Sequence, residues 1–167
     1  MTGSELTAQD VFARMLREHV APALRTAGLL GSGQTFELRD AGTWAVLGFC
    51  KSRYSHAGEV EFTVMVAAVG KDRWEQIRAD VTRPRLGRRP APSDTVYAQA
   101  LRLDQLPGGP GDAWFTVHPD TDPAVLAAGL LEHVRAAALP WLAERAGRHP
   151  HRDTAAGQSA TVGDLRV

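Results

Sequence analysis

Five arginines gather between positions 78 and 89, in a stretch that also holds Pro84 and is followed by Pro90 and Pro92. Guanidinium groups donate paired hydrogen bonds to phosphate or carboxylate, so this cluster could bind an anionic partner. The chain has 19 basic and 19 acidic residues, however, and no overall field attracts nucleic acid. We therefore predict a solvated loop and consider nucleic acid an unexpected partner. The five residues are Arg78, Arg83, Arg85, Arg88 and Arg89.

A polar run, Lys51-Ser52-Arg53, closes an apolar stretch, and Thr63 lies in the next one. A lysine can activate a serine as a nucleophile. Neighbouring residues of a strand point to opposite faces, so a regular strand keeps Lys51 and Ser52 apart and we expect no catalytic residue here. The candidate ligand-binding residues are Lys51, Ser52, Thr63, Arg85, Trp44 and Trp114.

The histidines and the single cysteine give little support to metal chemistry. None of the six histidines forms an i, i+4 pair, and His149 with His151 is explained by the polar composition around them. His118 with Asp120 could act as a base, although a turn capped by Asp120 explains the pair equally well. Cys50 excludes an internal disulfide and a zinc site of several thiolates. We expect no metal and no cofactor.

Length and composition indicate one globular domain. A chain of 167 residues with 44% hydrophobic and 23% charged residues is close to the globular average. The N-terminus does not have the pattern of a signal peptide, and no uninterrupted apolar run reaches the roughly 20 residues of a membrane span. We expect a cytoplasmic protein with no membrane partner.

Two amphipathic helices are predicted at the two ends of this domain. Apolar residues recur every three or four positions from residue 11 to residue 24, with Pro22 expected to kink or restart the helix and Gly28 to end it. The second helix starts at Thr121 or Asp122, before Pro123, and we expect Pro140 to interrupt it.

Strand patterns fill the region between the helices. Residues 35–39 and 44–50 read as a hairpin, and residues 62–69 are apolar at both parities, as in a central strand covered on both faces. A short helix is predicted over 72–80, and further strands over 95–103 and 113–117. The fold class is therefore α+β, with an antiparallel sheet of about five strands in a single domain over 7–145. Residues 146–167 are predicted to form a flexible tail.

The motifs stand in a recognisable order between Val11 and Leu142. In this order the chain resembles a bacterial family, the domain of unknown function numbered 4304, whose members have no established activity. The family tends to have glutamine and asparagine where this chain has Cys50 and Met65, so a ligand site built on those amides would be altered here. The matching residues are Pro22, Leu24, Gly28, Thr35, Phe36, Phe49, Lys51, Ser52, Phe62, Thr63, Val64, Arg85, Leu86, Gly87, Asp112, Ala113, Trp114, Phe115, Leu139, Pro140 and Trp141.

Two functional hypotheses follow from the sequence. The first is a binding or interaction protein without catalytic activity, such as an immunity-type or accessory partner-binding module, by analogy of fold alone. The alternative is a small-molecule binding protein or enzyme, with a pocket between sheet and helices for an anionic ligand. The first would present a flat apolar patch and the second a deep pocket. A homodimer is compatible with both.

A truncation tests the predicted tail. A chain ending at Gly147 is expected to melt within a few degrees of the full chain, because the residues beyond it lack apolar periodicity and offer little to bury. Thermal unfolding followed by circular dichroism measures the difference. A larger loss of stability would mean that the tail packs on the domain or on a second subunit.

Overall fold

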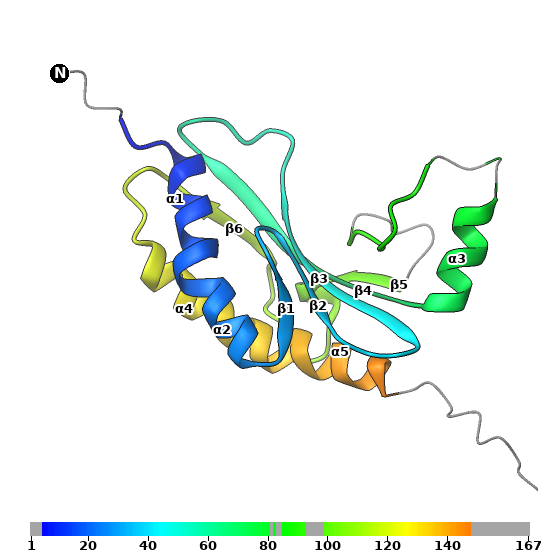
Figure 1. Ribbon diagram of the computed structural model, residues 1–167. Coiled ribbons are helices and arrows are strands. Elements are labelled where there is room, and N and C mark those ends of the chain that lie inside the picture. Colours follow the sequence, from blue (N-terminus) through cyan, green and yellow to red (C-terminus); the bar gives the residue numbers. More distant parts are fainter. Residues whose placement is uncertain (1–4, 81, 83–84, 93–98, 148–167) are drawn as a thin grey trace, which may run out of the picture.

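The computed structural model describes residues 5–80, 82, 85–92 and 99–147. Figure 1 shows one sheet with the helices of both chain ends on one face and helix α3 on the other. This is the α+β fold that the patterns predict, with an antiparallel sheet between an N-terminal and a C-terminal helix. The predicted tail, apart from residues 146 and 147, lies outside the described residues.

The sheet is antiparallel throughout, in the order β1-β2-β3-β4-β5 with β6 also on β4. β5 pairs with residues 65–68 of β4 and β6 with residues 60–63, so β4 is hydrogen-bonded along both edges. The predicted central strand and its pairing with residues 44–50 are therefore confirmed. The strands are β1 (Leu29–Ser32), β2 (Thr35–Leu38), β3 (Thr43–Lys51), β4 (Val60–Gly70), β5 (Gln99–Arg102) and β6 (Trp114–Val117).

β4 explains why the sheet needs cover on both faces. Phe62, Val64 and Val66 are buried on the face of the terminal helices, where Phe62 packs against Phe12 at 4.9 Å between ring centroids. Ala67 and Val69, at the opposite parity, are buried on the other face. A strand that is apolar at both parities exposes hydrocarbon to water unless both faces are packed.

The N-terminal helix runs past its proline without a break. α1 (Ala8–Met15) starts with a capping box between Thr7 and Asp10 and continues through a π-helical segment, Leu16–Val20, into α2 (Ala21–Thr26). Pro22 has no N–H for an i→i−4 bond. The wider π turn gives the preceding residue a partner, since the Ala21 N–H donates to the Leu16 carbonyl.

The C-terminal helix repeats this solution. α4 (Pro123–His133) is capped by Asp122, and a π-helical segment, Val134–Ala138, leads into α5 (Leu139–Ala146). The predicted interruption at Pro140 is therefore wrong, because the Leu139 N–H donates to the Val134 carbonyl and the helix continues. By length and composition this helix could also cross a membrane, a test that core helices of soluble proteins pass, and its apolar stripe lies in the core beside the sheet.

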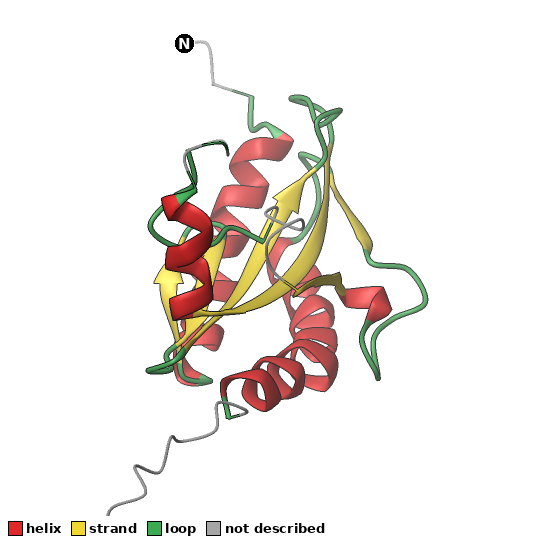
Figure 2. Cartoon of the chain, turned by 90° about the vertical axis from the view of Figure 1, so that its right-hand side faces the viewer, coloured by secondary structure: helices red, strands yellow, loops and turns green. Residues whose placement is uncertain are grey.

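The segment after β4 covers the second face of the sheet, as Figure 2 shows. Helix α3 (Lys71–Ala79) buries Trp74 completely, and the Trp74 Nε1–H donates to the Arg88 carbonyl at 3.2 Å. Pro92 lies directly over Gly48, where a β-carbon would collide with the proline ring. The stretch that we predicted as a solvated loop therefore packs in part on the second face of the sheet.

Two strand predictions differ from the structure in extent. No strand was predicted over β1, because its four residues carry little apolar pattern, and three of them are exposed in the structure. The strand predicted over 95–103 is seen as β5, and residues 93–98 lie outside the described residues. Among the described residues the sheet has six strands, one more than predicted.

Substituting Gly48 by alanine tests the packing of the cover. Gly48→Ala is expected to lower the free energy of unfolding by about 1–3 kcal/mol, because the new methyl group collides with Pro92. Gly129→Ala is the matched control: no neighbouring group lies within 4 Å of its β-carbon position, and alanine favours the helix by roughly 1 kcal/mol. Urea unfolding measures both variants. Equal stabilities of Gly48→Ala and the parent chain would contradict the packing of residues 85–92 on β3.

Candidate functional site

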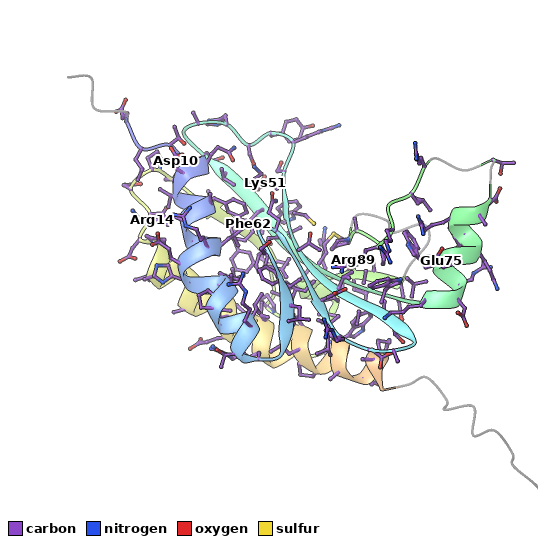
Figure 3. The ribbon with its side chains drawn as sticks, in the orientation of Figure 1. Asp10, Arg14, Lys51, Phe62, Glu75 and Arg89 are labelled. Carbon is purple, nitrogen blue, oxygen red and sulfur yellow. The ribbon has the colours of Figure 1, made fainter. Side chains whose placement is uncertain are left out.

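A cavity of about 250 Å³ lies between the N-terminal helix and the end of the sheet. One wall is formed by α1, the π-helical segment and α2, and the other by the β1–β2 turn and the end of β3, where Lys51 lies beside α1 (Figure 3). The lining residues are Gln9, Phe12, Ala13, Leu16, Arg17, Ala21, Arg25, Ser32, Gly33, Gln34 and Lys51.

The helical wall combines a buried apolar row with a row of mostly polar residues beside it. Phe12, Leu16 and Ala21 are buried, with 2–3% of their surface exposed, and form an apolar floor. Beside them Gln9, Ala13, Arg17, Ala21 and Arg25 follow one another every four residues, which places them along one side of a helix. Because the π turn keeps the helix continuous past Pro22, these polar and apolar side chains line the same cavity, which we call the groove.

Lys51 reaches the groove because of its parity in β3. It shares the helix-facing side with Phe49 and Leu47, and its Nζ donates to Gln9 Oε1 at 3.0 Å and lies 5.7 Å from the centre of the Phe12 ring. Both partners are neutral. Within the described part of the chain, no carboxylate oxygen lies within 4.0 Å of Lys51 Nζ.

The two arginines of the groove differ in how their charge is balanced. Arg17 forms an ion pair with Glu18 at 3.1 Å. Arg25 donates to the Gly31 carbonyl at 2.9 Å and, among the described residues, has no carboxylate within 4.0 Å. Gly31 and Gly33 both have positive φ, 143° and 64°, so glycine at these positions permits the tight turn that closes the wall.

The structure separates the residues predicted as one site. Lys51 alone lines the cavity. Thr63 and Trp114 are cross-strand neighbours on the opposite face, and Ser52 Oγ accepts from the Tyr54 N–H at 3.2 Å, so Lys51 and Ser52 have different partners. Arg85 is exposed in the segment that covers the second face.

Trp44 lies at the other end of β3, in a hollow of about 190 Å³. Lys71 Nζ and Arg89 Cζ lie 4.6 and 5.7 Å from the centre of its ring, and Arg89 also pairs with Glu37 at 3.3 Å. Lys71 in turn donates to the Asp40 carbonyl at 2.5 Å. Arg89 has a carboxylate partner and Lys71 a backbone carbonyl, and these contacts attach α3 and residues 85–92 to the sheet.

The remaining candidate groups are dispersed. His118 Nε2 lies 3.9 Å from Glu59, at an exposed position, and Asp120 is not part of that contact. The described residues contain no cluster of three or more histidine, cysteine, aspartate or glutamate side chains that could hold a metal ion. The row Cys50–Thr63–Trp114 crosses three strands of the second face, where Thr63 Oγ1 is buried without a hydrogen-bond partner in the described chain.

Sequence reasoning missed most of the cationic groove. Gln9, Arg17, Arg25 and Gln34 were not among the predicted site residues. Gln34 in fact joins the turn to β3, since its Nε2 donates to the Phe49 carbonyl at 2.7 Å. The signal present in the sequence was the four-residue ladder of Gln9, Arg17 and Arg25 directly beside the buried row.

A comparison with protein-family models matches residues 20–144 to a family described as a domain of unknown function, DUF4304. The chain belongs to this family. The match contains Arg25 of α2, the β1–β2 turn, Lys51 and all six strands, while Gln9, Phe12 and Arg17 precede it. Searches of curated proteins and of solved structures gave no match.

The two positions at which this DUF4304 member was predicted to depart from the family lie on the second face of the sheet. Cys50 pairs with Thr63, and Met65 pairs with Gly48 in the next row. Both side chains point away from the face that Lys51 shares with the helices. The departures therefore leave the groove unchanged.

Cys50 provides a test of the second face. Burial raises the pKa of its thiol, so less thiolate is present near neutral pH and the reaction with a disulfide reagent such as Ellman's reagent is slowed. We expect the folded chain to react at least about tenfold more slowly at pH 8 than the urea-unfolded chain, which is an internal control because Cys50 is the only cysteine. The rate should rise as the pH approaches the raised pKa. Equal rates in the two states would show that this face is open.

Proposed function

We propose that this protein is a small cytoplasmic binding protein without catalytic activity, whose groove between α1–α2 and the sheet binds a small anionic ligand with an apolar body. The observation that carries the proposal is the composition of the groove. Among the described residues, its lining contains three cations, Arg17, Arg25 and Lys51, and no carboxylate, above the buried side chains of Phe12 and Leu16.

Each property of the groove supports one property of the ligand. Charged donors without a carboxylate partner favour an anion, since hydrogen bonds to ionised groups are about twice as strong as neutral ones. The apolar floor favours a hydrocarbon body, whose burial contributes about 0.8 kcal/mol per methylene group. The side chains that line the groove are cations, two amides, a hydroxyl and apolar groups, which suit binding and orientation of a ligand.

A second candidate function is binding of a protein partner, as an immunity-type or accessory module. It is favoured by Trp114, which is 40% exposed beside the buried, unpartnered Thr63 Oγ1. Exposed tryptophan is enriched at protein interfaces. Helix α3 and residues 85–92 already cover the rest of this face, so the open area is small and the groove is the better supported site.

Calorimetry with decanoate, decan-1-ol and decylamine tests the proposed function. Decanoate is expected to bind and decylamine is not, because the groove has cations and no carboxylate. Ala13→Trp, which fills the groove from its rim, should abolish decanoate binding, whereas Ala128→Trp on the exposed side of α4 should leave it unchanged. Binding of decylamine as tight as that of decanoate, or binding that survives Ala13→Trp, would contradict the proposal.

A further inference from the structure

The cations of the groove are placed far apart, and this placement restricts the ligand further. Lys51 contacts Gln9 at the start of α1, whereas Arg25 contacts Gly31 beside the end of α2. The row Gly31–Phe36–Leu47 crosses the sheet, and Lys51 lies four residues further along β3. With ordinary strand dimensions, the backbone positions of Gly31 and Lys51 are roughly 17 Å apart.

The cation between these two ends already has a carboxylate partner. Arg17 lies in the middle of the groove and pairs at 3.1 Å with Glu18, which also lies 4.0 Å from Arg14 outside the groove lining. Lys51 and Arg25 are the groove's two cations without a carboxylate within 4.0 Å in the described chain, each with a single neutral acceptor. One unbalanced positive charge therefore stands at each end, separated by the apolar floor of Phe12, Leu16 and Ala21.

We propose that the ligand is a linear, mostly apolar molecule with a carboxylate at each end, an α,ω-dicarboxylate. This inference rests on the proposed function and specifies its ligand. A phosphate monoester carries nearly two charges on one group and would need two unbalanced cations at one point. Here each end offers a single cation, which matches a carboxylate. The cavity of about 250 Å³ is lined by residues of both ends, Lys51 and Arg25, with the apolar side chains between them, which suits a chain that is apolar in its middle.

The two ends supply different geometry to the two carboxylates. The Lys51 ammonium can turn one of its three protons from Gln9 to the ligand. Arg25 uses one guanidinium N–H on the Gly31 carbonyl, and its remaining donors can meet a carboxylate in the planar, paired arrangement. Gln9 and Gln34 provide further amide donors along the rim.

The decisive measurement is the affinity of sebacate relative to decanoate, which have the same chain length and differ by one carboxylate. We expect sebacate to bind at least about tenfold more tightly to the unmodified chain, since a second charged hydrogen bond is made. Lys51→Met and Arg25→Met should each remove this preference and leave decanoate binding within about a factor of two or three, because decanoate can use the remaining cation.

Controls separate charge from folding. Arg17→Met should keep the preference for sebacate, since Glu18 already pairs with Arg17. Arg25→Lys keeps the positive charge and should retain much of the preference for sebacate. Lys51→Met tests the same preference at the end of β3, without a change in the β1–β2 turn. Thermal unfolding of each variant shows whether the fold is intact.

The outcomes distinguish this inference from the proposed function. Equal affinities for sebacate and decanoate, with binding still blocked by Ala13→Trp, would overturn the dicarboxylate and leave the groove as an anion site. A sebacate preference that persists in Lys51→Met and Arg25→Met would also overturn it. Failure of both acids to bind at millimolar concentration would overturn both proposals.

Discussion

The structure depends on one constraint, which is that β4 is apolar on both faces and hydrogen-bonded along both edges. Exposure of either face to water would be unfavourable, so the neighbouring elements pack on the strand and remove it from solvent. β3 covers one edge, and β5 and β6 divide the other between them. The terminal helices pack on Phe62 and Val66, while α3 and residues 85–92 cover the face of Ala67 and Val69.

The helices can cover this sheet only because their prolines do not break them. Each proline is preceded by a π-helical segment, in which the amide of the residue before the proline bonds five residues back. A π-helical turn is rarer than an α-helical one and occurs often at functional sites. In the first helix the π-helical segment contributes Leu16 and is followed directly by Ala21. The segment that keeps the helix continuous therefore also forms part of the groove.

Much of the fold could be predicted from local pattern, and the errors have physical causes. Residues 62–69 and 44–50 carry long apolar runs, and Asp122 before Pro123 is a strong helix start, so these elements were found. β1 has one buried and three exposed residues and carries no such pattern. Pro140 was expected to interrupt its helix because proline normally removes a hydrogen bond, and no rule of sequence alone reveals that a π turn replaces it. Trp74 packs over the second face of the sheet through contacts with residues that are distant in sequence, which local pattern does not reveal.

The candidate site was less predictable because it depends on which charges remain unbalanced after folding. The sequence has zero net charge, and the arginines between positions 78 and 89, its densest cluster, were the first candidate for binding an anion. In the folded chain, Arg89 pairs with Glu37, Arg78 with Glu75 and Arg102 with Asp104. Two cations of the groove, Lys51 and Arg25, have only neutral partners there.

Lys51 and Arg25 are 26 positions apart in the chain, so no count of local charge can find them as a pair. The helix-facing parity of β3 and the β1–β2 turn bring them to one groove, and a chain of zero net charge thereby acquires a locally positive groove.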